Sequence, residues 1–139
     1  MKIVFLDVDG VLHPVDCPST EYFMPVCMER LRRIVAAAGE RALIILSSSS
    51  RVGEEGRGLV DAQLTKAGLP RVAGVTPEGR SRGAEIVAWL DENPGVTHFV
   101  VLDDIDLTTH HRLKDNAVAT RPSFGLRDKD VGRAVRILM

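Results

Sequence analysis

The sequence predicts an α/β fold in which helices cover both faces of a parallel sheet, in a three-layer, Rossmann-like arrangement. Short apolar runs rich in β-branched residues alternate with stretches of helical length along the 139 residues, which is typical of such a sheet. Three of the apolar runs end directly in acidic or hydroxyl residues, as expected where strand ends form a binding site. The chain contains no repeat, low-complexity tract or linker, so we expect residues 1–139 to form a single domain.

The first half of the chain predicts two buried strands separated by one helix. Residues 3–8 (IVFLDV) are rich in β-branched and aromatic side chains, which is typical of a strand covered on both faces. After a polar loop, the apolar spacing predicts a helix over 25–38, with Val26 on its buried side and Gly39 at its end. A second apolar run, residues 42–46, leads directly into four consecutive serines.

The second half of the chain continues the same alternation. Its helical stretches end at glycine or at a Pro-Gly pair, and its apolar runs have the length of strands. In order, the predicted elements are a helix over 58–67, a strand over 72–75, a helix over 81–92, strands over 98–102 and 117–119, and a helix over 128–138.

Composition and charge favour a soluble cytoplasmic protein. The 18 basic and 19 acidic residues give a net charge of −1, so the charge balance calls for neither a nucleic-acid nor a membrane partner. The N-terminal apolar run is too short for a secretory leader or a membrane span. Cys17 and Cys27 fit neither a CxxC motif nor a zinc site, and we expect both to be free thiols.

Polar residues follow three of the predicted strands, at the point where each strand ends. Asp7 and Asp9 end the first strand, Ser47 ends the second, and Asp103 and Asp104 end the strand over 98–102. Ligands of open α/β sheets bind beyond the carboxyl ends of the strands, where the strand order reverses. The sequence therefore predicts one shared site at this edge.

The chemistry of these residues predicts a magnesium-dependent reaction at phosphorus. Neighbouring carboxylates raise one another's pKa unless a cation lies among them, and oxygen ligands without His or Cys favour Mg²⁺. We expect Asp7 to act as a nucleophile that forms an aspartyl-phosphate, and Asp9 to act as general acid and then as general base. The hydroxyl and backbone N–H of Ser47 would bind phosphoryl oxygens, and a cationic side chain would balance the transition-state charge. Arg82 is the first candidate for this cation.

Four segments of the chain resemble the motifs of the haloacid dehalogenase (HAD) superfamily of phosphohydrolases. FLDVDGVLHP resembles motif I (DxDxV/T), IILSSSSR motif II, SRGAEIVAWLDEN motif III and FVVLDDIDL motif IV, in the family's order. More narrowly, these segments and the closing FGLRDKDVGRAVRIL are similar to the HAD domains of Swiss Army Knife RNA repair proteins. The resemblance covers nearly the whole chain and implies a HAD-like fold and phosphatase activity.

The resemblance also implies roles for the acidic residues. Asp7 would be the nucleophile and Asp9 the general acid/base, a combination that favours phosphatase chemistry within the superfamily. Mg²⁺ would be held by Asp7, the backbone carbonyl of Asp9 and Asp103, with Asp104 near the ion or linked to it through water.

The phosphate-binding residues implied by the resemblance are Ser47 and Arg82. Because four serines follow one another, Ser48 is an alternative to Ser47. Motif III usually carries Lys, whereas this chain offers only arginines, with Arg80 second and Arg51 third after Arg82.

The spacing between the motifs leaves no room for the cap domain that many HAD proteins insert. An open site suits a large substrate, so we expect a phosphomonoester hydrolase that acts on a large substrate such as a polynucleotide end. Alternatives are a phosphatase of a small metabolite or a phosphoprotein, a phosphotransferase or mutase, and a Mg²⁺-binding regulatory module of low activity.

The loop over 14–22 could form a small flap, and His13 lies near the site without an assigned role. Arg30, Arg32 and Arg33 are expected to form a solvated helix face.

Overall fold

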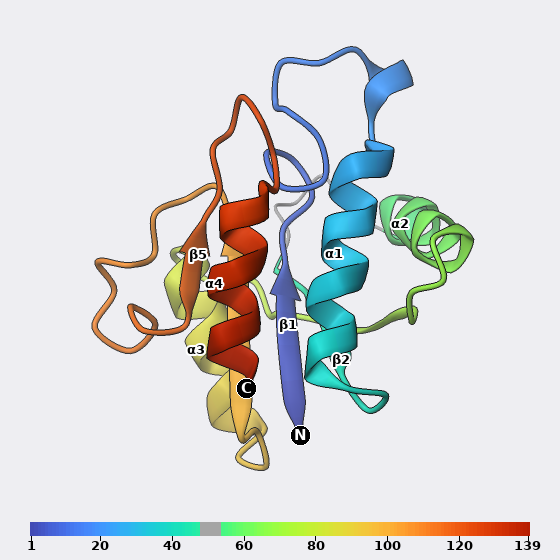
Figure 1. Cartoon of the computed structure of the whole chain (residues 1–139). Coiled ribbons are helices and arrows are strands. Elements are labelled where there is room, and N and C mark those ends of the chain that lie inside the picture. Colours follow the sequence, from blue (N-terminus) through green and yellow to red (C-terminus); the bar gives the residue numbers. More distant parts are fainter. Residues whose placement is uncertain (48–53) are drawn as a thin grey trace.

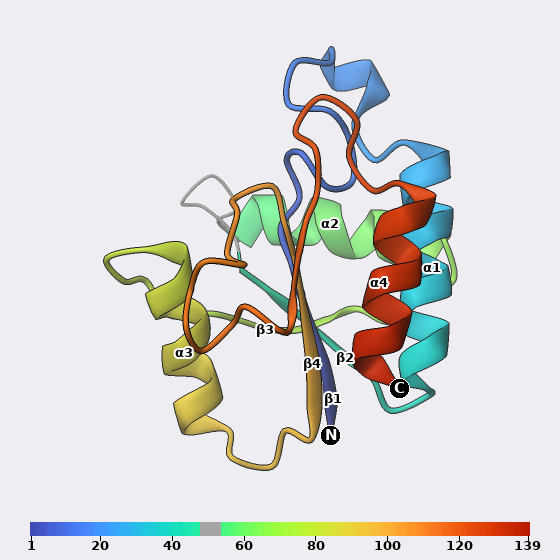
Figure 2. The ribbon, with the colours of Figure 1, turned by 60° about the vertical axis from the view of Figure 1, so that its left-hand side comes forward.

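A parallel sheet of five strands forms the centre of the computed structural model, which describes residues 1–47 and 54–139. The strands lie in the order β3-β2-β1-β4-β5, and helices cover both faces of the sheet (Figures 1 and 2). This arrangement confirms the predicted α/β, Rossmann-like fold. The strands are β1 (Lys2–Leu6), β2 (Leu43–Leu46), β3 (Val72–Val75), β4 (His98–Asp103) and β5 (Ala117–Ala119). The helices are α1 (Pro25–Ala38), α2 (Glu54–Lys66), α3 (Arg82–Glu92) and α4 (Asp128–Leu138), with a short 3₁₀ helix, η1, at Ser19–Glu21.

The helix boundaries agree with the sequence prediction to within one residue, except that α2 begins at Glu54, four residues before the predicted start. The prediction that Val26 is buried was wrong, because Val26 is 45% exposed. The buried side of α1 runs through Cys27, Leu31 and Ile34. Val26 lies one residue earlier, about 100° around the helix, on the outward stripe that continues at Arg30.

The two faces of the sheet carry separate hydrophobic clusters. Side chains alternate along each strand, so Leu6 packs on the face covered by α1, α2 and α4, whereas Phe5 packs on the face covered by α3. Figure 2 shows α3 on one side of the sheet and the α1–α4 pair on the other. Phe5 fixes α3 by an edge-to-face contact with Trp89, with the ring centroids 5.4 Å apart. This packing determines where the first residue of α3 lies.

The strand register brings three predicted site residues into one row. Leu6 of β1 pairs with Leu46 of β2 and with Leu102 of β4. The next residues along the three strands, Asp7, Ser47 and Asp103, therefore form the next row. Because side chains alternate, this row faces the α3 side of the sheet, where the cluster around Phe5 also lies. The chain passes from one side of β1 to the other between β3 and β4, so the row lies at the switch point of the strand order.

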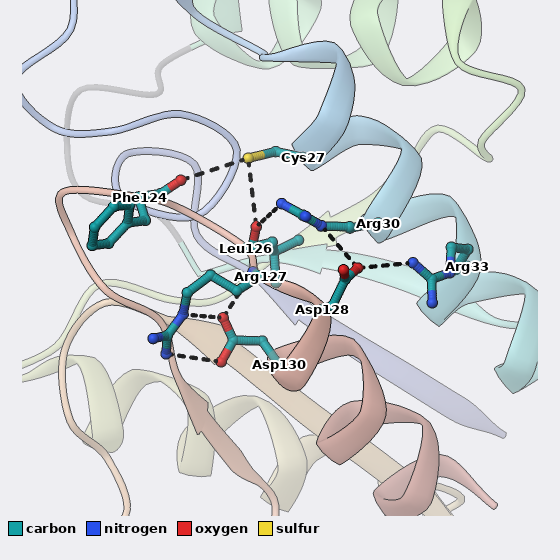
Figure 3. A network of polar contacts seen from close by, with 8 residues as sticks. All are labelled: Cys27, Arg30, Arg33, Phe124, Leu126, Arg127, Asp128 and Asp130. Carbon is teal, nitrogen blue, oxygen red and sulfur yellow. Dashed lines mark hydrogen bonds and ion pairs between the residues drawn. The ribbon is translucent and has the colours of Figure 1, made fainter.

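The loop after β1 is held against the segment that precedes α4. The N–H of Val15 donates to the carbonyl of Pro122, and the N–H of Leu126 donates to that of Val11. Figure 3 shows the neighbouring contacts, in which Arg30 of α1 donates to the carbonyl of Leu126. The same figure shows Arg30 and Arg33 of α1 sharing Asp128, and Arg127 paired with Asp130 at the start of α4. These contacts therefore fix the position of the loop after β1 relative to the start of α4.

No cap domain is evident over residues 1–47 and 54–139, since the described connections at the carboxyl edge of the sheet contain no helix or strand other than η1. In the same part of the chain, no helix is both long and apolar enough to cross a membrane.

Candidate active site

Three carboxyl groups meet beyond the ends of β1 and β4. Asp7, Asp103 and Asp104 each contribute one oxygen to a group whose members lie within 4.8 Å of one another. Asp7 and Asp103 are buried, and Asp104 is partly exposed. The backbone holds the first of them in place, because the N–H of Asp7 donates to the carbonyl of Leu102 and extends the ladder between the two strands. We call Asp7, Asp103 and Asp104 the acidic cluster.

Gly10 allows Asp104 to join this cluster. The φ angle of Gly10 is +78°, a conformation that favours glycine, and the Thr120 hydroxyl fixes the turn by donating to the carbonyl of Gly10 over 2.7 Å. A Cβ atom on Gly10 would lie 2.5 Å from Oδ2 of Asp104, so only glycine leaves room for this carboxyl group. The neighbouring Asp106 lies outside the cluster and accepts a hydrogen bond from the backbone N–H of Thr108.

Arg82 at the start of α3 contacts two of the three acids. Its Nη1 donates to Oδ2 of Asp103 over 2.6 Å and lies 3.4 Å from Oδ1 of Asp7. Its side chain is 10% exposed, so this contact is largely shielded from water. Ser81 caps α3 by accepting a hydrogen bond from the N–H of Ala84, which fixes the first turn that carries Arg82. Among the sequence candidates for the cation, the structure thus places Arg82 in the site.

The two other arginine candidates differ from Arg82. Arg80 is exposed to solvent, two residues before Arg82 in the connection that leads into α3. Arg51 lies outside the described residues. Ser48, the alternative phosphate-binding serine, also lies outside them.

The acidic cluster carries more negative charge than Arg82 offsets. Burial, together with the charges of Asp103 and Asp104, raises the pKa of Asp7 from 3.8 to about 8, although Arg82 lowers it. Burial also raises the pKa of Asp103 to about 6, against the opposing effects of Arg82 and of the N–H of Ile105, which donates to Oδ1. With a pKa of about 8, Asp7 is fully ionised at neutral pH only when further positive charge lies beside it.

Ser47 contributes a buried hydroxyl to the same row. Its Oγ is fully buried and has no hydrogen-bond partner among residues 1–47 and 54–139. The expectation that its backbone N–H also binds phosphate was wrong, because this N–H donates to the carbonyl of Leu6 and continues the ladder between β1 and β2. A buried hydroxyl without a partner is costly, so Ser47 Oγ is suited to bind a group that enters the site.

Asp9 lies in a different environment from the acidic cluster. Its Oδ1 is 2.8 Å from Nε2 of His13, and its side chain is 35% exposed. The His13 ring is 1% exposed. Its centroid lies 4.1 Å from that of Tyr22, on which it stacks, and 5.9 Å from that of Phe23 in an edge-to-face contact. Sequence reasoning assigned no role to His13, because its contact with Asp9 depends on a loop conformation that has no sequence signature.

Comparison with known protein families identifies the relationship of this chain to other proteins. The family model described as the HAD domain in Swiss Army Knife RNA repair proteins matches residues 3–131. The chain belongs to this family. Membership indicates a phosphatase-type hydrolase. No curated protein and no solved structure matches the chain.

The acidic cluster of this HAD domain fits a divalent cation. HAD domains typically use Mg²⁺, and Mg²⁺ prefers hard oxygen ligands of the kind that Asp7, Asp103 and Asp104 supply. Burial raises the pKa of Asp7 and of Asp103, and neighbouring carboxylates raise it further, so a cation where the three oxygens meet would stabilise their ionised forms. The donor set and the charge therefore both favour an ion held by this HAD domain.

Proposed function

We propose that the chain is a Mg²⁺-dependent phosphomonoester hydrolase that acts through an aspartyl-phosphate on Asp7. The observation that carries the proposal is the acidic cluster with Arg82 beside it, at the carboxyl edge of a HAD fold. Asp9, two residues after Asp7, adds the second carboxyl group that a phosphatase requires. A binding module would have no need for this second acid.

In the proposed reaction, the carboxylate of Asp7 attacks phosphorus and the bond to the leaving oxygen breaks. The leaving oxygen takes a proton from the carboxyl group of Asp9. Asp9, now ionised, then takes a proton from a water molecule, whose oxygen attacks the phosphorus of the aspartyl-phosphate. This step releases inorganic phosphate, frees Asp7 and restores the proton on Asp9.

Two other residues stabilise the phosphoryl group in this scheme. Arg82 supplies a fixed positive charge close to Asp7, and the hydroxyl of Ser47 is available to donate to a phosphoryl oxygen. Mg²⁺, bound by Asp7, Asp103 and Asp104, would supply the charge that keeps Asp7 ionised and neutralises the phosphoryl oxygens. Because the pKa of Asp7 is about 8 without an ion, we expect little activity at neutral pH in the absence of Mg²⁺.

The space beside Asp9 supports a substrate with a flat apolar group next to its phosphate. A hollow of about 200 Å³ adjoins Asp9 and His13, and its other walls include Tyr22, Phe23 and Leu59. The leaving group must lie near Asp9, which protonates it, and the base of a terminal nucleotide has the shape and character to occupy this hollow. We therefore favour a terminal phosphate of a polynucleotide as substrate.

The charged residues of α1 support recognition of an end rather than of a long strand. Arg30 and Arg33 are paired with Asp128, and Arg32 is paired with Glu29. These ion pairs engage arginine side chains that a long polynucleotide would need to bind its backbone phosphates. The net charge of the chain is also only −1.

The first experiment is hydrolysis of an aryl phosphate with and without Mg²⁺, by the wild type and by Asp7→Asn. This substitution keeps the shape of the side chain but removes the nucleophile. We expect release of phosphate that requires Mg²⁺ and disappears in the variant. Activity retained by Asp7→Asn would contradict the proposal.

A second experiment distinguishes the substrate classes. We expect higher kcat/KM for 3′- or 5′-phosphorylated oligonucleotides than for phosphopeptides or sugar phosphates. Preference for phosphopeptides or sugar phosphates would favour the phosphoprotein or metabolite alternative, and transfer of phosphate to an alcohol in place of water would indicate a phosphotransferase.

A further inference from the structure

We propose that His13 is a positioning residue that orients the carboxyl group of Asp9 for proton transfer and itself neither gains nor loses a proton. This inference rests on the proposed function, in which Asp9 is the general acid and base. It is carried by the contact between Nε2 of His13 and Oδ1 of Asp9, and by the structure that fixes the imidazole ring.

The location of the proton on His13 follows from its two hydrogen bonds. The backbone N–H of Phe23 lies 3.3 Å from Nδ1 of His13 and can only donate. Nδ1 must therefore accept, which leaves the proton of the neutral ring on Nε2. Nε2–H in turn donates to Oδ1 of Asp9 over 2.8 Å. The backbone N–H of Phe23 thus fixes the tautomer of His13 whose Nε2–H donates to Asp9.

The segment around Phe23 carries strain that accompanies this contact. Phe23 has a φ of 58° and is the one residue other than glycine with a positive φ in the described part of the chain. A bulky side chain rarely adopts this conformation, because it is sterically costly. Here it places the N–H of Phe23 within hydrogen-bonding distance of Nδ1 and brings the aromatic ring of Phe23 into edge-to-face contact with the His13 ring.

The remaining contacts prevent the imidazole ring from turning away. Tyr22 stacks on one face of the ring with an interplanar angle of 13°. The N–H of Gly10 donates to the carbonyl of His13, and the N–H of Met24 donates to that of Leu12. His13 is therefore fixed through its backbone, its two ring nitrogens and its ring face.

Asp9 needs such an anchor because its site is open. Its side chain is 35% exposed, whereas His13 is buried. A general acid must lie within hydrogen-bonding reach of the leaving oxygen, and small misplacements of a catalytic group reduce the rate strongly. No cap domain that could contact Asp9 is evident over the described residues. His13, which belongs to the HAD domain itself, therefore orients the carboxyl group of Asp9.

The test compares two substrates that differ in their need for a proton. A nitrophenyl phosphate has a leaving group that departs without protonation, whereas an alkyl phosphate requires the general acid. For His13→Phe, which keeps a flat ring but removes both hydrogen bonds, we expect kcat/KM to fall ~10–100-fold on the alkyl phosphate and less than ~3-fold on the aryl phosphate. His13→Gln keeps a donor for Asp9 and should recover most of the loss.

Three further variants serve as references. Asp9→Asn should show the same dependence on the leaving group, and adding His13→Phe to it should cause little further loss, because both changes act on one proton transfer. His98→Gln changes a histidine at the opposite end of β4 and should leave both substrates unaffected. Circular dichroism and thermal unfolding identify any His13 variant that fails to fold, in which case His13→Gln and the spectrum described next decide the question.

Nitrogen NMR of labelled histidine tests the geometry without any activity. We expect His13 to carry its proton on Nε2, with Nδ1 unprotonated. A proton on Nδ1, an equal loss of kcat/KM on the two substrates, or no loss on either would overturn the positioning role. Wild-type protein that hydrolyses neither substrate would instead contradict the proposed function, and the spectrum would then still report whether His13 is fixed as the structure shows.

Discussion

Asp7 and Asp9 are two residues apart in the sequence, yet they lie in opposite surroundings. Asp7 is buried beside two other acids and Arg82, and its pKa is raised to about 8. Asp9 is partly exposed and is held by a buried imidazole ring within an aromatic pocket. The surroundings of Asp7 bring several acidic groups together, whereas those of Asp9 fix the orientation of its carboxyl group.

This contrast shows how one short segment can supply two different catalytic groups. Asp7 continues the ladder of β1, so the sheet register places it beside Asp103. The chain leaves the sheet after Asp7 and turns at Gly10, which directs Asp9 toward the loop that contains His13. In the proposed function, Asp7 needs a cation to become a nucleophile, whereas Asp9 needs an anchor to transfer a proton.

The largest expected effect concerns the cation of the acidic cluster. Arg82→Ala should lower kcat/KM by ~10²–10³-fold, because it removes the fixed charge that faces Asp7 and the phosphoryl group. Arg82→Lys should recover part of the loss, since it restores the charge without the planar geometry. Steady-state kinetics would measure both. The matched control is Arg80→Ala, which changes an exposed arginine two residues away and should retain wild-type kinetics. Equal losses in Arg82→Ala and Arg80→Ala would contradict the assignment.

The raised pKa values predict that protons and Mg²⁺ compete for the acidic cluster. Between pH 6 and pH 8, the pKa values of Asp103 and Asp7, the affinity for Mg²⁺ should rise up to about tenfold per pH unit, and it should level off above pH 8. Calorimetric titration of wild type with Mg²⁺ at several pH values would test this. Affinity independent of pH in this range would show that these carboxyl groups do not bind the ion.

Stability without metal should show the opposite trend with pH. A carboxyl group whose pKa is raised on folding favours the folded state fully below its unfolded value, here 3.8, and this contribution is lost as the pH rises through about 8. We therefore expect the metal-free protein to unfold more easily at pH 8 than at pH 6 and Mg²⁺ to offset the difference. In Asp7→Asn the pH dependence should be weaker. Thermal unfolding with EDTA and with Mg²⁺ measures both effects.

Gly10 should be more sensitive to substitution than a glycine of the same backbone conformation elsewhere. Gly68 has a φ of +77°, and nothing lies within 4 Å of a Cβ placed on it. Gly68→Ala should therefore cost only the backbone strain, about 1–2 kcal/mol. Gly10→Ala should cost more, because it also displaces Asp104, and it should weaken Mg²⁺ binding, whereas Gly68→Ala should not. Urea unfolding and Mg²⁺ titration would separate the two contributions, and equal behaviour of the two variants would refute a role for Gly10 in placing Asp104.

The smallest effect is expected far from either acid. Arg33 and Asp128 form an exposed ion pair between α1 and α4 (Figure 3). Exposed pairs contribute little to stability, so Arg33→Ala should change neither the unfolding midpoint nor the aryl phosphatase activity measurably. A clear loss of activity on oligonucleotides alone would instead show that this face contacts the substrate.

The fold could be predicted from the sequence because its strands are buried on both faces. Their apolar runs are continuous, and the polar residues that end them lie in one row once the strands pair in register. Asp7, Ser47 and Asp103 were therefore recognisable from their positions alone. Arg82 could be ranked before Arg80 because the sequence predicted a helix over 81–92, and the structure begins α3 at Arg82 with Ser81 as the cap.

The surroundings of Asp9 could not be predicted in this way. His13 reaches Asp9 because the loop after β1 turns at Gly10 and because Phe23 adopts a positive φ. Neither conformation follows from hydrophobic periodicity, since the Gly10 turn is fixed by the Thr120 hydroxyl and Phe23 by its contact with His13, both of which are tertiary contacts. The same loop gives Asp104 its place in the acidic cluster, a role that the sequence left open.

The most direct test of this account is to find where the phosphoryl group is attached during turnover. The Asp9→Asn variant should be mixed with Mg²⁺ and a nitrophenyl phosphate, quenched in acid, digested and analysed by mass spectrometry, with Asp7→Asn as the control. We predict one added phosphoryl group on Asp7 in the first variant, because Asp9 is no longer present to activate water, and none in the second. A phosphoryl group on any other residue, or turnover by wild type with no phosphorylated intermediate in Asp9→Asn, would contradict the assignment of Asp7 as nucleophile and Asp9 as general acid/base.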